Sequence, residues 1–146
     1  MEAQTTHMTE VFLDTAFAIA LSSPKDSHHE QAVQISKQLE SDATRLVRTR
    51  AVIIEIGNAL AKQPFRTAAT DLIESLEQDP DAEIIPVSEE LCNRAFDLYR
   101  KRRDKEWGLT DCISFVVMHD KGLSAALTTD RHFQQAGFQA LMRSDT

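Results

Sequence analysis

A buried helix is predicted to begin within the segment Trp107-Gly108-Leu109-Thr110-Asp111-Cys112-Ile113-Ser114-Phe115. Gly108 interrupts the preceding chain, Thr110 is a good capping residue, and a mainly apolar run follows up to Met118. With Thr110 as the N-cap, Asp111 is the first helical residue, where a carboxylate interacts favourably with the partial positive charge of the helix end. Taken alone, Asp111 is therefore interpreted as a capping acid, but the chain has three further acids in apolar surroundings.

The size and composition of the chain indicate one cytoplasmic domain that spans residues 1–146. Hydrophobic residues make up 42% of the chain, which is enough for one core, and no apolar run is long enough to cross a membrane. The N-terminal residues lack the layout of a signal peptide, and neither Cys92 nor Cys112 has a second ligand at metal-binding spacing. The net charge of −7 argues against a protein that coats nucleic acid by bulk charge, but it does not exclude an enzyme that uses a metal ion.

Short apolar runs alternate with helical patterns along the chain, which is typical of an α/β fold. We expect strands at residues 11–13, 45–48, 83–87, 125–129 and 138–142. One or two predicted helices separate each strand from the next, so the strands should form a mainly parallel central sheet of about four to five strands flanked by helices. One of these helices follows Thr49 and is apolar on nearly every side, which predicts that it is buried.

Four acidic residues occupy positions that this topology can bring to one edge of the sheet. Asp14 and Asp130 each follow a predicted strand, and ligands bind at the carboxyl ends of the strands in open parallel sheets. Asp111 begins a helix at that same edge, and Glu55 lies about one turn into the helix after Thr49. Each acid has a structural alternative, since Asp14 and Asp130 are possible N-caps and Glu55 can bond to a neighbouring helix end. Four such coincidences together are less plausible than one shared site.

Four carboxylates held close together would repel one another strongly, and no Lys or Arg lies within the apolar segments that carry them. A bound divalent cation removes this repulsion. Oxygen ligands without His or Cys partners favour Mg²⁺ or Mn²⁺ over Zn²⁺. We therefore predict a metal site in which these acids fix the cation and accept a proton from water.

Four segments of the chain resemble PIN-domain proteins, and in particular the VapC-type toxins of bacterial toxin–antitoxin pairs. The segments are Phe12-Leu13-Asp14-Thr15, residues 50–60, residues 108–115 and residues 127–133. The resemblance implies a PIN-like fold, with a central parallel sheet flanked by helices, and a Mg²⁺-dependent endoribonuclease. It also implies that Asp14, Glu55 and Asp111 are the core catalytic and metal-binding acids, that Asp130 completes the set, and that Thr110 takes the position of a small hydroxyl residue. Such toxins usually form homodimers and are silenced by a cognate antitoxin protein, so both partners are expected here.

A run of basic residues, 100–105, precedes the Asp111 helix and is a candidate surface for RNA. Arg100, Arg102 and Arg103 could bind phosphates there, close to Thr110. Alternatively, these cations serve the helix that they terminate, because positive charge is favourable at a helix C-terminus. Trp107 also has two interpretations, since it could stack on a base or pack into the core.

Two other functions compete with a metal-dependent ribonuclease. An aspartyl-phosphate protein would suit Asp14 at a strand end and Thr128 or Thr129 after another strand. A phosphatase of that kind needs an acid at position 16, where this chain has Ala16, and a receiver domain needs a Lys after its last strand, where this chain has none. The other alternative is a PIN-like module that binds RNA or protein without catalysis. The four acids argue against it, because clustered carboxylates repel RNA unless a metal ion neutralises them.

Overall fold

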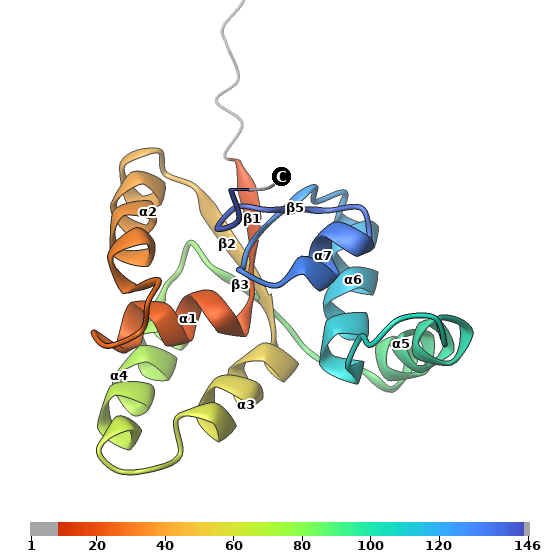
Figure 1. Ribbon diagram of the computed structural model, residues 1–146, viewed down its shortest axis with the longest axis horizontal. Coiled ribbons are helices and arrows are strands. Elements are labelled where there is room, and N and C mark those ends of the chain that lie inside the picture. Colours follow the sequence, from red (N-terminus) through yellow and green to blue (C-terminus); the bar gives the residue numbers. More distant parts are fainter. Residues whose placement is uncertain (1–8, 145–146) are drawn as a thin grey trace, which may run out of the picture.

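Five parallel strands form one sheet at the centre of the molecule, in the order β3-β2-β1-β4-β5. The computed structural model describes residues 9–144 (Figure 1). The strands are β1 (Glu10–Leu13), β2 (Arg45–Thr49), β3 (Glu83–Ile85), β4 (Ala125–Leu127) and β5 (Gln139–Ala140). In the centre, Phe12 of β1 pairs with Val47 on one side and with Ala126 on the other. The predicted parallel sheet is therefore confirmed.

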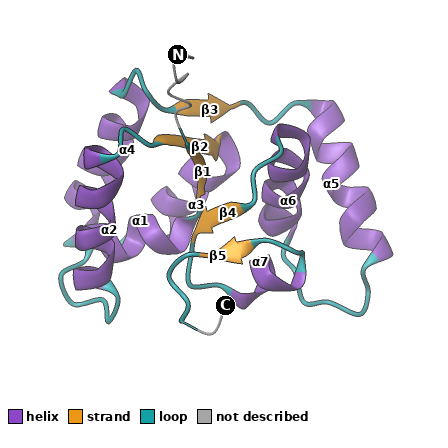
Figure 2. Cartoon of the chain, turned by 90° about the horizontal axis from the view of Figure 1, so that it is seen from above, coloured by secondary structure: helices purple, strands orange, loops and turns teal. Residues whose placement is uncertain are grey.

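Seven helices within residues 9–144 surround this sheet. They are α1 (Thr15–Ser22), α2 (His29–Ser41), α3 (Arg50–Ala59), α4 (Phe65–Gln78), α5 (Glu89–Lys101), α6 (Leu109–Lys121) and α7 (Arg131–Gln135). Figure 2 shows α1, α2 and α4 on one side of the sheet and α5, α6 and α7 on the other. Because both faces are covered, the central strand β1 is buried from Val11 to Leu13. None of the helices within the described range is both long and apolar enough to cross a membrane.

A chain of aromatic contacts fixes α6 and α7 against the end of the sheet. The ring of Phe12 in β1 lies 6.3 Å from that of Phe133 in α7, measured between centroids. Phe133 meets Phe115 of α6 edge to face at 5.0 Å, and Phe115 meets Trp107 in the same way, also at 5.0 Å. Edge-to-face contacts of this kind add to the free energy of burial and define orientation. The starts of α6 and α7 are thus held beside the carboxyl end of β1.

The prediction for the start of α6 is wrong. The helix begins at Leu109 with Gly108 as its N-cap, so Asp111 is the third helical residue and Thr110 lies inside the helix. The reason is that the Asp111 carboxylate reaches back and its Oδ2 accepts the backbone N–H of Gly108 at 3.0 Å. An acid at the third position that binds the N-cap amide is one half of a capping box, and it replaces the hydroxyl cap that the sequence suggested.

The helix α3 is less buried than its sequence predicts. Its start is as expected, because the Thr49 side chain accepts the backbone N–H of Val52 at 3.1 Å. Val52 and Ile56 are fully buried, but Ile54 is 57% exposed, so the helix has one open apolar face. The helix leaves the carboxyl edge of the sheet and is covered by neighbours on one side only, which the apolar pattern alone does not show (Figure 1).

Candidate active site

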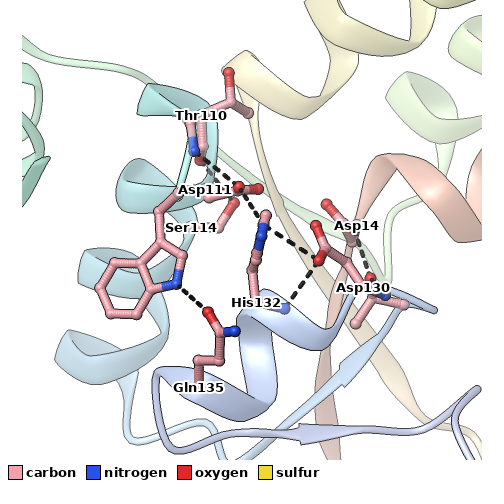
Figure 3. Close-up of polar contacts among 10 residues, drawn as sticks. Asp14, Thr110, Asp111, Ser114, Asp130, His132 and Gln135 are labelled. Atoms are coloured by element: carbon pink, nitrogen blue, oxygen red, sulfur yellow. Dashed lines mark hydrogen bonds and ion pairs between the residues drawn. The ribbon is translucent and has the colours of Figure 1, made fainter. Parts of the chain in front are cut away.

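Three of the four predicted acids meet at the carboxyl edge of the sheet. Asp14 follows β1, Asp111 lies in the first turn of α6, and Asp130 precedes α7. Figure 3 shows their carboxylates directed toward one another, with the ring of His132 between Asp111 and Asp130. The strand order explains this arrangement, because β1 and β4 are neighbours and the chain leaves both at the same edge.

Asp14 is a buried carboxylate held by a hydroxyl. It occupies the N-cap position of α1, but within residues 9–144 its side chain makes no capping hydrogen bond. Its Oδ2 instead accepts the Thr128 hydroxyl at 2.7 Å, and Thr128 Oγ1 in turn accepts the backbone N–H of Asp130 at 3.0 Å. Thr128 is itself fully buried. The end of β4 therefore ties two of the acids together, and the simple capping interpretation of Asp14 does not describe its contacts.

Burial raises the pKa of Asp14 from 3.8 to about 7. The hydroxyl of Thr128 and the adjacent backbone amide of Thr15 act against this increase, whereas the charges of Asp111 and Asp130 add to it. The pKa of Asp111 is also raised by burial, and the charge of Asp130 adds to that shift. The charges of neighbouring acids thus disfavour the charged forms of Asp14 and Asp111.

Asp130 is the N-cap of the short helix α7, as one interpretation of the sequence had it. Its Oδ1 accepts the backbone N–H of His132 at 2.9 Å. The ring nitrogen Nδ1 of the same His132 lies 3.3 Å from Asp130 Oδ1 and 3.4 Å from Asp111 Oδ2. Asp111, Asp130 and His132 place one potential ligand atom each within 4.8 Å of one another. A capping role and a place in the acidic cluster therefore coexist in Asp130, as they do in Asp111.

The sequence did not identify His132 or Thr128 as members of this site. The backbone N–H of His132 orders the turn after Asp130. Its ring was missed, although an Asp-x-His pattern at a helix start places the His in the same turn as the acid. Thr128 precedes Asp130 by two residues at the strand end, but its contact with Asp14 depends on β1 and β4 being neighbours.

Glu55 lies apart from the group formed by Asp111, Asp130 and His132. It is partly buried on α3, and in the described part of the chain it is not among the residues whose ligand atoms gather there. The helix that carries it contacts both α1 and α6. Its assignment as a metal ligand stays a prediction.

The predicted RNA-contact residues lie close to one another on the surface beside α6. Arg100 pairs with Asp97 and lies over the Phe96 ring, Arg102 pairs with Asp104, and Arg103 is exposed. The carbonyl of Thr110 accepts the Ser114 hydroxyl within α6. Trp107 is only 6% exposed, so the packing interpretation is the correct one for its ring.

The donor set of the acidic cluster fits a hard divalent cation. Carboxylate oxygens are the ligands that Mg²⁺ and Mn²⁺ prefer, and a buried carboxyl whose pKa rises to about 7 indicates negative charge without full compensation. Beside Asp14, the buried Thr15 Oγ1 has no hydrogen-bond partner among residues 9–144, and buried polar atoms are rarely left so without a water or an ion. His132 adds one nitrogen donor that the sequence analysis did not include.

A five-stranded parallel sheet with acids gathered at its carboxyl edge defines the class of this protein, and the model of the PIN domain matches residues 11–139. The chain therefore belongs to the PIN-domain family. It is similar to the 23S rRNA-specific endonuclease VapC20 of Mycobacterium tuberculosis, with 25% identity over 128 residues that cover 88% of this chain and 95% of that relative.

Solved structures agree with this relationship. The crystal structure of M. tuberculosis VapC20, a sarcin–ricin loop cleaving toxin, matches with a TM-score of 0.77 and 25% identity, again over 88% of this chain and 95% of that one. The structure of FitAcB from Neisseria gonorrhoeae matches with a TM-score of 0.62 over 89% of this chain and 94% of that one, and at 21% identity it shows the shared fold alone. The predicted membership of the PIN-domain family and the predicted VapC-type relationship are confirmed. The predicted enzyme class, an endoribonuclease, is also the class to which VapC20 belongs.

Proposed function

We propose that this protein is a divalent-metal-dependent endoribonuclease and the toxin of a toxin–antitoxin pair. The observation that carries the proposal is the buried Asp14 carboxyl, whose pKa is raised to about 7 beside Asp111 and Asp130. A protein gains nothing in stability from such a cluster, so its presence in a PIN domain supports a catalytic use. The similarity to VapC20, an rRNA endonuclease, supports RNA as the substrate.

We assign Asp14, Asp111 and Asp130 as the acids that would hold Mg²⁺ or Mn²⁺, with Glu55 as a fourth ligand. When bound, the cation supplies charge neutralisation at the phosphate and a more acidic attacking water. The chain itself supplies orientation, because Thr128 fixes Asp14 and the Gly108 amide fixes Asp111.

Exposed apolar side chains support the expected protein partners, a cognate antitoxin and a second copy of the chain. Ile54 on α3 is 57% exposed and Phe65 on α4 is 43% exposed, and large exposed apolar residues are typical of surfaces that another protein covers. We further propose that the protein acts in the cytoplasm, where such RNA substrates are found. Light scattering after size-exclusion chromatography, with the chain alone and co-expressed with the product of the adjacent reading frame, tests both partners.

Cleavage of an RNA pool that contains 23S ribosomal RNA tests the function directly. We expect cleavage with Mg²⁺ or Mn²⁺ and none with a chelator. Asp14→Asn should lower the rate by at least about a hundredfold, the usual effect of losing a catalytic acid–base group. The matched control is Asp71→Asn, because Asp71 is an exposed acid on α4 outside the cluster. Equal rates for Asp14→Asn and the wild type, or metal-independent cleavage, would contradict the proposal.

A further inference from the structure

A cavity of about 480 Å³ lies between α5, α6 and α7. Trp107, Phe115 and Phe138 contribute aromatic rings to its lining, and Lys101 and Arg102 contribute positive charge. Trp107 and Phe115 are only 6% and 3% exposed, so the groups within reach of a ligand are the cations and the partly buried Phe138. Cations combined with a planar stacking surface are typical of sites that bind single-stranded nucleic acid. None of the three acids of the cluster is among the residues that line this cavity.

Arg102 places its guanidinium over the Trp107 ring in this cavity. Its guanidinium carbon lies 4.9 Å from the centroid of the Trp107 ring. Its Nε and Nη2 atoms donate to Oδ1 and Oδ2 of Asp104, both at 3.0 Å, so the two side chains form a bidentate pair. In consequence the pKa of Asp104 is lowered to about 2. Trp107 is fixed as well, because its Nε1 donates to Gln135 Oε1 at 3.0 Å.

This arrangement makes Arg102 an ordered, planar group with an accessible surface. The guanidinium carbon lies over the indole, and 39% of the side chain is exposed. The pair with Asp104 limits the rotamers of Arg102, so the guanidinium, which is planar, is offered to a ligand in one main orientation. RNA bases stack on such arginine planes as they do on aromatic rings.

A second, smaller cavity lies between α7 and residues 104–106, and the acids Asp104 and Glu106 are part of its lining. It has a volume of about 250 Å³ and is lined by Lys105, Arg131, His132 and Gln135, among others. Gln135 also lines the larger cavity, and His132 lies between Asp111 and Asp130. Figure 3 shows Gln135 on the same short helix as His132, and its Oε1 accepts the Trp107 Nε1–H at 3.0 Å. A bound strand could therefore run from the acidic cluster past His132 to Arg102.

We propose that these two cavities, which share Gln135 and are called the groove below, form a subsite for single-stranded RNA. In this subsite a base that flanks the cleaved bond stacks on Arg102. Lys101 lies on the rim and Lys105 and Arg131 lie along the path, where they would contact phosphates. The proposal rests on the ribonuclease function proposed above. It names Arg102 as a residue that would set the base preference of the enzyme next to the cleaved bond. Stacking on a platform is tolerant of base type, so we expect a preference among bases at one position and not a strict requirement.

The fluorescence of Trp107 provides the test, because it is the one Trp of the chain and lies directly beneath Arg102. Short single-stranded oligoribonucleotides of uniform base are titrated into the full-length wild type, Arg102→Ala and Arg102→Lys. Arg102→Lys keeps the charge and removes the planar surface. The matched control is Arg66→Lys on α4, since Arg66 is an exposed arginine across the sheet. Thermal unfolding verifies that each variant is folded.

We expect RNA to change the Trp107 signal in the wild type and Arg66→Lys. Arg102→Lys and Arg102→Ala should both weaken binding by about tenfold, which is typical for the loss of one stacked base. In cleavage assays both should raise KM more than they lower kcat and should flatten the base preference next to the cut. The salt dependence of binding should be unchanged in Arg102→Lys, because the number of positive charges is the same.

Three results would overturn the subsite. The first is that both Arg102 variants keep the RNA affinity, the KM and the base preference of the wild type. The second is weakened binding in Arg102→Ala but not in Arg102→Lys, which would show that only the charge matters. The third is unchanged RNA binding with loss of a bound protein partner, which would assign the groove to that partner. A folded wild type that cleaves no RNA with Mg²⁺ or Mn²⁺ would instead contradict the ribonuclease function itself.

Discussion

Replacing Asp14 by Asn should make the metal-free protein more stable, and the gain should grow with pH. The folded-state pKa of Asp14 is about 7, against 3.8 for the free side chain. Between these two values the folded state binds more protons than the unfolded state. The contribution of the protonated Asp14 carboxyl to the free energy of unfolding is therefore complete below about pH 4, and it is lost as the pH rises through about 7. Asn does not titrate, and its amide oxygen can still accept the hydrogen bond from Thr128.

The size of this effect follows from the interval between the two pKa values. At about 1.4 kcal/mol per unit, the interval from 3.8 to about 7 corresponds to about 4 kcal/mol at about pH 8, where both states are ionised. At about pH 5 only about 2 kcal/mol has been lost, because the folded state is still largely protonated. The difference in free energy of unfolding between Asp14→Asn and the wild type should thus widen by about 2 kcal/mol over this range.

Urea unfolding followed by circular dichroism, with a chelator present throughout, measures this difference. The control is Asp71→Asn, whose difference from the wild type should be small and should not change with pH, since Asp71 is exposed on α4. The reasoning is refuted if Asp14→Asn is no more stable than the wild type at about pH 8, or if the gap between them does not depend on pH.

Three further predictions concern the other residues of the proposed metal site and the hydroxyl that holds Asp14. Mn²⁺ should raise the midpoint of thermal unfolding of the wild type by binding the folded state only, and Asp111→Asn should show a much smaller increase in the same scan. Thr128→Val should lower the free energy of unfolding by about 1–3 kcal/mol and reduce cleavage, because it removes the hydrogen bond to Asp14, whereas Thr128→Ser should retain both in denaturant titrations and RNA assays. Glu55→Gln should weaken the Mn²⁺ response if Glu55 is a ligand, and an unchanged response in calorimetric titration would remove it from the site.

Patterns along the chain predicted the sheet and the gathering of three acids at its carboxyl edge, because the positions of these acids follow from strand ends and a helix start. Asp14 and Asp130 follow apolar runs that are central strands, and the carboxyl ends of parallel strands share one edge. Thr128 could not be assigned, since its hydroxyl bridges two segments that meet only after β1 and β4 pair. The exposure of Ile54 was missed for the same kind of reason, because an apolar residue on a helix does not reveal whether a neighbour covers it.

The structural and functional interpretations of these acids are not exclusive, and their place in the helices explains why. Asp14, Asp111 and Asp130 each lie at the N-terminal end of a helix, namely α1, α6 and α7. The partial positive charge of a helix N-terminus stabilises a carboxylate within the first turn. Three helix ends directed at one point therefore offset part of the repulsion and allow the metal-free chain to fold with its acids close together. Glu55 lies in the second turn of α3 and lacks this support.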